Sequence, residues 1–108
     1  MPTSSIWLTY DLGVDGDYES LYHWLDTHDA VECGDSVAYF RYDHKRDLVE
    51  DLRKELGRVM KLRLKDRVYV VFPSKGGKYK GRFILGRRKP APWVGVAGKA
   101  EETIDEPS

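Results

Sequence analysis

The chain has 108 residues, 41% of them apolar, and its 18 basic residues balance its 18 acidic ones. This length fits one small domain and excludes a multidomain enzyme, because domains cluster around roughly 100–150 residues. No apolar run approaches the roughly 20 residues of a membrane-spanning helix, and the N-terminus lacks a signal-peptide pattern. The single cysteine, Cys33, excludes a disulfide scaffold. We therefore expect a cytoplasmic protein.

The zero net charge conceals a gradient along the chain. Residues 1–40 carry −8, residues 41–60 carry +1, residues 61–100 carry +11 and the last eight residues carry −4. Local fields of this size steer charged partners. The gradient is compatible with nucleic-acid binding through the basic half and with self-association between the two halves. It is equally compatible with two solvated faces that have no partner.

The first third of the chain predicts a strand followed by a helix. Residues 6–12 alternate between apolar and mostly polar side chains, which is the period of a strand. Gly13 and Gly16 then mark a loop. Asp17 stands at the N-cap position of a helix that ends near 28–29, and its apolar residues follow helical spacing.

The middle of the chain predicts a second strand and a second helix. Residues 30–33 form a short, mixed segment, and residues 34–35 form a tight turn. The aromatic-rich stretch 36–42 favours a strand. Asp43 is the expected N-cap of a helix over 44–60, which carries one apolar stripe. Residues 61–66 then form a polar connection.

The basic half predicts a hairpin of two strands. Residues 67–72 are β-branched and almost wholly apolar, so we expect a central strand. A loop over 73–78 leads to a returning strand over 81–86, and Pro90 and Pro92 prevent regular pairing after it. From Gly98 onward the acidic sequence predicts a disordered tail.

Two helices on one face of an antiparallel sheet predict an α+β fold. The order strand, helix, strand, strand, helix, strand favours a ferredoxin-like βαββαβ sandwich with an appended C-terminal strand. We expect one domain over 1–97 and a tail over 98–108. The apolar faces predict one shared core, formed by Leu8, Leu21, Leu25, Val37, Leu52, Leu56, Val68 and Val70.

Three segments resemble a known protein family. They are Tyr10-Asp11-Leu12 at the end of the first strand, Asp35-Ser36-Val37-Ala38-Tyr39-Phe40 in the middle, and Asp66 to Pro73 (DRVYVVFP) in the last core strand. In this order and spacing they resemble the small CRISPR-associated nuclease subunit of spacer acquisition and its relatives, which include toxin–antitoxin ribonucleases. The resemblance spans residues 6–73 in pieces.

The resemblance implies a ferredoxin-like homodimer whose last strands extend across the partner. Some members cut RNA or DNA with a divalent metal, and others only bind. In that family the aspartate that closes the first strand is the proposed metal ligand, which makes Asp11 the candidate catalytic and metal-binding residue. Such a carboxylate could meet its symmetry mate and hold Mg²⁺.

This chain departs from the family pattern directly after Asp11. Active relatives commonly place arginines there, whereas this sequence continues Gly-Val-Asp-Gly-Asp over residues 13–17. Asp15 and Asp17 are further possible ligands, but an acidic loop repels phosphate. The alternative is that Asp11 is a strand-end carboxylate and Asp17 a plain N-cap.

The remaining chemistry-bearing residues give weak signals. The spacing of His23, His28, Cys33 and His44 does not match a regular metal site. Cys33 has no base nearby in the sequence that would make it a nucleophile, so we expect a buried, inert thiol. Residues 74–78 (SKGGK) form a basic loop and not a phosphate-binding Walker motif.

The basic cluster near the C-terminus is the most informative feature. Positive side chains alternate there with aromatic rings, the combination that binds single-stranded nucleic acid. The candidate nucleic-acid-binding residues are Lys78, Tyr79, Lys80, Arg82, Arg87, Arg88 and Trp93. The alternative is a Lys-decorated edge strand that resists aggregation.

Three functional hypotheses follow from these observations. The first is a small dimeric protein that binds RNA or DNA, weakly catalytic or non-catalytic, in a defence or toxin–antitoxin setting. The second is a metal-dependent endoribonuclease that uses Asp11 from each protomer. The third is a protein-interaction module with an acidic N-terminal half.

Overall fold

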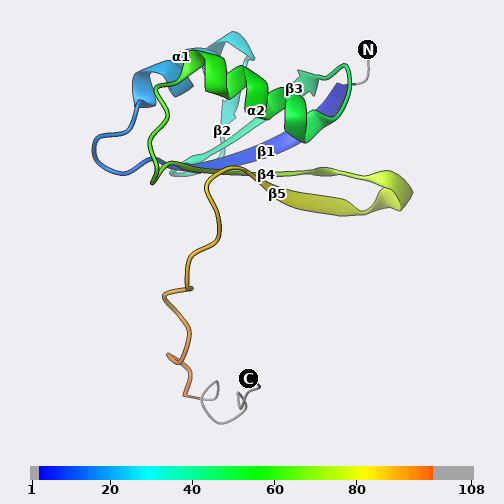
Figure 1. The fold of residues 1–108 in the computed structure, drawn as a ribbon. Helices are drawn as coiled ribbons and strands as arrows, with labels where there is room; N and C mark the ends of the chain where they lie inside the picture. Colours follow the sequence, from blue (N-terminus) through cyan, green and yellow to red (C-terminus); the bar gives the residue numbers. More distant parts are fainter. Residues whose placement is uncertain (1–2, 99–108) are drawn as a thin grey trace.

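Five antiparallel strands and two α-helices make up the fold of residues 3–98, the part of the chain that the computed structural model describes (Figure 1). The elements are β1 (Thr3–Asp11), α1 (Tyr18–Thr27), β2 (Val31–Glu32), β3 (Val37–Asp43), α2 (Leu48–Val59), β4 (Arg67–Pro73), the short 3₁₀ turn η1 (Lys75–Gly77) and β5 (Tyr79–Leu85). This arrangement confirms the α+β class.

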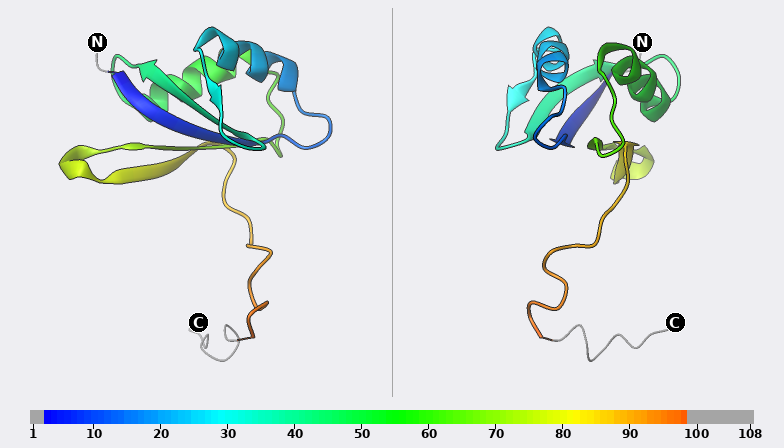
Figure 2. Two further views of the ribbon diagram at one scale, coloured as in Figure 1. Left: turned by 180° about the vertical axis from the view of Figure 1, so that it is seen from behind. Right: turned by 60° about the vertical axis from the view of Figure 1, so that its left-hand side comes forward.

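The strands lie in the order β2-β3-β1-β4-β5, and every pair of neighbours is antiparallel. Each helix joins two strands that lie on either side of a third, because α1 links β1 to β2 around β3, and α2 links β3 to β4 around β1. Both helices lie on the same face of the sheet (Figure 2). The opposite face carries no helix from the described residues.

The core lies between the helices and this one face. In β1, Ile6 and Leu8 are fully buried, while Trp7 and Thr9, which alternate with them, are half-buried on the other face. Strand β4 repeats the pattern with Val68 and Val70. The helices contribute buried leucines to the same cluster, namely Leu21, Leu25, Leu48, Leu52 and Leu56.

The N-cap of α2 differs from the prediction. Asp17 caps α1 as expected, since its Oδ1 accepts a hydrogen bond from the Ser20 N–H at 3.2 Å. In α2, however, Asp47 is the cap, and it accepts from the Glu50 N–H at 3.0 Å. Asp43 is wrong as the cap because it is the last residue of β3, where it lies opposite Thr3.

Two predictions about buried side chains are also wrong. Val37 is only half-buried and lies outside the core, because β3 turns Ala38, Phe40 and Tyr42 toward the helices instead. Cys33 is exposed rather than buried. It follows β2, a two-residue strand at the edge of the sheet, where none of the described residues buries its side chain.

The basic hairpin is longer than its sequence predicts. Strand β4 extends to Pro73, and β5 begins at Tyr79, two residues before the predicted start. The predicted tail over 98–108 lies outside the described residues, except for Gly98. Among the described helices, none is long and apolar enough to cross a membrane.

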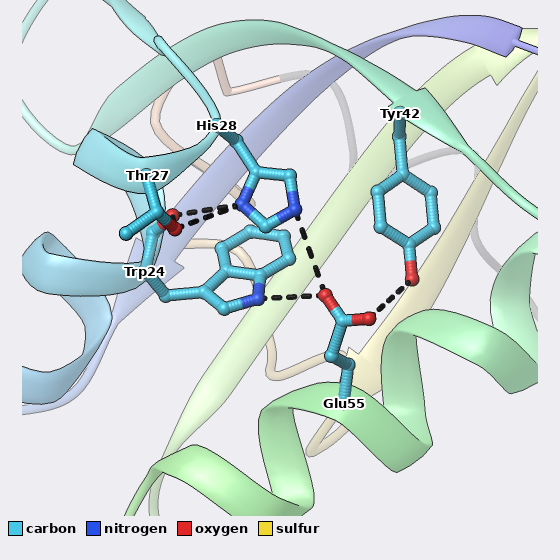
Figure 3. Close-up of polar contacts among 5 residues, drawn as sticks. All are labelled: Trp24, Thr27, His28, Tyr42 and Glu55. Atoms are coloured by element: carbon cyan, nitrogen blue, oxygen red, sulfur yellow. Dashed lines mark hydrogen bonds and ion pairs between the residues drawn. The ribbon is translucent and has the colours of Figure 1, made fainter.

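The carboxylate of Glu55 in α2 forms polar contacts with α1 and with β3 (Figure 3). Oε1 of Glu55 accepts a hydrogen bond from the Trp24 indole N–H at 2.8 Å and lies 3.6 Å from His28 Nε2. Its Oε2 accepts from the Tyr42 hydroxyl at 3.3 Å. Burial, reinforced by the Glu55 charge, raises the pKa of Tyr42.

We expect Leu52→Ala to lower the free energy of unfolding by about 2–4 kcal/mol, because it leaves a cavity in the closed core. Leu52 is fully buried, whereas Leu64 is fully exposed. Leu64→Ala is therefore the matched control and should stay within about 0.5 kcal/mol of wild type. Urea unfolding measures both, and equal losses would contradict the described core.

Glu55→Ala should cost about 1–3 kcal/mol, because it leaves the donors of Trp24 and Tyr42 without their acceptor. Glu55→Gln should cost less, since its amide oxygen still accepts one hydrogen bond. Glu50, on the exposed side of α2, forms an ion pair with Arg53 at 3.3 Å. Glu50→Ala should thus change unfolding by less than about 1 kcal/mol, and a loss as large as that of Glu55→Ala would contradict the role of Glu55.

Candidate nucleic-acid interface

The face of the sheet opposite the helices, here called the open face, carries aromatic rings from four strands. Trp7 of β1 lies 4.9 Å from Tyr39 of β3 and 6.2 Å from Tyr79 of β5, measured between ring centroids. Tyr69 of β4 lies 4.8 Å from Phe83 of β5. Rings spread over a flat face are the surface on which unpaired bases stack.

An arginine covers the second pair of rings. The Cζ atom of Arg88 lies 5.8 Å from the centroid of Tyr69 and 5.5 Å from that of Phe83, within the range of a cation–π contact. The Tyr69 ring lies across Gly81, where a Cβ atom would come within 1.9 Å of the Tyr69 hydroxyl. Gly81 therefore allows the ring to lie flat on the sheet.

Five cationic side chains lie close together where β4 begins and β5 ends, at the end of this hairpin opposite its turn. A cavity of about 500 Å³, here called the basic cavity, is lined by side chains from the connection before β4, from β4 and from the segment after β5. Its charged lining is entirely basic and comprises Lys65, Arg67, Arg87, Arg88 and Lys89. Such a cluster favours a phosphate group or another anion.

A smaller cavity of about 260 Å³, here called the aromatic cavity, adjoins the basic cavity and shares Arg67 and Arg88 with it. It is also lined by Tyr69, Phe83 and the carboxylate of Asp11. Asp11 Oδ2 accepts a hydrogen bond from Arg67 Nη2 at 3.1 Å. This hydrogen bond lowers the pKa of Asp11, so its carboxylate stays ionised at neutral pH.

The structure separates the residues that the sequence grouped together. Arg87 and Arg88 line the basic cavity, and Tyr79 lies on the open face. Lys80 and Arg82 lie opposite Phe72 and Val70, at register positions on the helix-bearing face. Lys78 precedes β5 in the hairpin turn, and Trp93 is 73% exposed in the segment after β5, which runs away from the domain.

Several residues of the two cavities and of the open face were not predicted as site residues from the sequence. Lys65 and Arg67 were read as part of a connection and a strand, and Trp7, Tyr39 and Tyr69 were not assigned to a site. The available signal was the strand period, because an aromatic or basic residue next to a buried one must face away from the core. Tyr69, between Val68 and Val70, is the clearest case.

The donor set does not fit a magnesium site within one chain. Asp11 is engaged with Arg67, and no group of three or more His, Cys, Asp or Glu among the described residues is placed to hold a metal ion. Asp17 is used elsewhere, since its two carboxylate oxygens accept from the backbone N–H groups of Ser20 and Lys61.

In comparisons with known proteins, no family model, no curated protein and no solved structure matches this chain. Its function must accordingly be argued from the two cavities and the open face.

The Asp11–Arg67 pair makes a direct prediction about titration. Because the Arg67 hydrogen bond lowers the pKa of Asp11, the carboxyl carbon of Asp11 should titrate below the ordinary range of an aspartate. Arg67→Gln should raise this pKa, since the charged donor is lost. Carbon-detected NMR titration measures both, and an unchanged Asp11 pKa in Arg67→Gln would contradict the pair.

Proposed function

We propose that this protein binds nucleic acid without cleaving it, with the basic cavity as the phosphate site and the open face as the surface for bases. The observation that carries the proposal is that one residue, Arg88, belongs to both the basic cavity and the open face. Arg88 lines the basic cavity and also lies over the rings of Tyr69 and Phe83. A phosphate and its neighbouring base could thus be bound together.

The charge distribution supports this proposal. Residues 61–100 carry +11, and the five lining cations of the basic cavity come from this part of the chain. Counterion release makes such a surface bind phosphate backbones with an affinity that falls as salt rises. The acidic N-terminal half contributes one carboxylate, Asp11, to the lining of the two cavities.

We also propose that the domain is ferredoxin-like, as the resemblance implies. The support is the strand order β2-β3-β1-β4 with antiparallel neighbours and both helices on one face. Membership of the CRISPR-associated and toxin–antitoxin superfamily stays a prediction. A homodimer is proposed on the exposed apolar residues Trp93, Val94 and Val96, which a second copy could cover.

The test is binding of labelled RNA and DNA oligonucleotides as a function of salt. Wild type should bind, and Arg87→Ala/Arg88→Ala should lose affinity and flatten the salt slope by about two units, one for each phosphate contact. The matched control is Lys54→Ala/Arg58→Ala, which removes two exposed cations from α2 on the helix-bearing side. Asp11→Asn should keep general binding.

Several outcomes would contradict the proposal. Absence of binding even at about 50 mM salt, where counterion release favours it most, would leave the cations as a solubility device or a protein-docking surface. Cleavage that requires Mg²⁺ and is lost in Asp11→Asn would favour the endoribonuclease instead. Light scattering of the same samples tests the homodimer proposal. A mass of 12.5 kDa, that of one chain, would contradict it.

A further inference from the structure

The carboxylate of Asp11 is not explained by phosphate binding. An acidic side chain beside a phosphate site weakens the attraction of the surrounding cations. Asp11 nevertheless lines the aromatic cavity, and its side chain is 56% exposed although it is paired with Arg67. A carboxylate has two oxygens with two acceptor positions each, so the hydrogen bond from Arg67 to Oδ2 leaves acceptor positions that a ligand could use.

The aromatic cavity has the size and walls of a site for one flat ring. Its volume of about 260 Å³ lies below the roughly 300–1,000 Å³ typical of sites for drug-sized ligands. Tyr69 and Phe83 supply ring faces, and the guanidinium of Arg88 supplies another planar group on which a base can stack. A single heterocyclic base matches this combination.

We propose that the aromatic cavity binds one unpaired guanine of a single strand, with Asp11 accepting hydrogen bonds from its Watson–Crick edge. The proposal rests on the nucleic-acid-binding function proposed above and adds the base and the strandedness to it. The phosphate next to that base would lie in the basic cavity, because Arg67 and Arg88 line both cavities.

Guanine fits the polar groups of the aromatic cavity better than the other bases. Its N1–H and N2–H₂ groups are adjacent donors that can reach both oxygens of one carboxylate. Its O6 and N7 atoms are the acceptors that arginine prefers among the bases. Adenine and cytosine offer a single amino group to Asp11, and uracil offers a single ring N–H.

The Watson–Crick edge is free only in a single strand. In a duplex it is paired to the opposite base, and the base is stacked between its neighbours, so it cannot enter the aromatic cavity. The proposal therefore predicts preference for single strands as well as for guanine.

The experiment compares labelled oligouridylates of about ten nucleotides, a length within the site sizes of small single-strand-binding domains. One central uridine is replaced by guanosine, adenosine or cytidine, and binding is followed by fluorescence anisotropy. Wild type should prefer the guanosine oligomer by roughly 5- to 100-fold, the discrimination of one bidentate base contact. A duplex of the same sequence should lose this preference.

Asp11→Asn should abolish the guanine preference without weakening binding of plain oligouridylate, because it removes a negative charge from a phosphate-binding surface. The matched control is Asp15→Asn, which makes the same change at an exposed site on the following loop. It should keep the guanine preference.

Gly81→Ala gives a second test that alters no charge. Its new Cβ would displace the Tyr69 ring, so the guanine preference should fall while the salt slope stays the same. Gly57→Ala is the control, because a Cβ at Gly57 meets no atom within 4 Å. Unfolding curves establish that each variant is folded.

The two proposals fail in different ways. Equal wild-type affinity for all four oligomers would overturn the guanine site and leave the nucleic-acid-binding function standing, as would a guanine preference that survives in Asp11→Asn. Absence of all binding at about 50 mM salt would overturn both. A guanine preference that Gly81→Ala leaves unchanged would also overturn the guanine site.

Discussion

The helices cover only one face of the sheet, and the rest of the structure depends on this constraint. Successive side chains of a strand point to opposite faces, so burial of Val68 and Val70 against the helices forces Arg67 and Tyr69 onto the open face. The same alternation in β1 buries Leu8 and exposes Asp11 three residues later. The hydrophobic core therefore fixes the composition of the open face without any contact to it.

Two glycines then bring the basic segment onto this face. Gly81 leaves room for the Tyr69 ring, and Gly86 adopts φ +75° directly after β5. At Gly86 a side chain would be strained by this backbone conformation, and its Cβ would lie 2.6 Å from the carbonyl oxygen of Asp66. The tight turn at Gly86 places Arg87 and Arg88 beside Arg67, which is far from them in sequence.

The element order was predictable from sequence because strand and helix periods are local. The face of the sheet on which each side chain lies, and the strand with which each strand pairs, were less predictable. Over 37–40 both alternating sets are apolar or aromatic, which led to Val37 being placed in the core although Ala38 and Phe40 are buried there. Asp43 and Asp47 both resemble N-caps, and only pairing of Asp43 with Thr3 decides between them. The convergence of Lys65 with 87–89 depends on the β4–β5 register, which no local pattern contains.

Charge and hydrogen bonding play separate parts in the two cavities. The five cations of the basic cavity attract any phosphate backbone, so they add affinity and no selectivity among bases. Asp11 has the opposite effect, because a carboxylate lowers general attraction but can accept only from bases that present donors. Its pair with Arg67 reduces the electrostatic cost and holds the carboxylate in the lining of the aromatic cavity. If this surface bound phosphate alone, an acid in this position would only weaken binding. Asp11 is therefore better explained by base recognition than by phosphate binding.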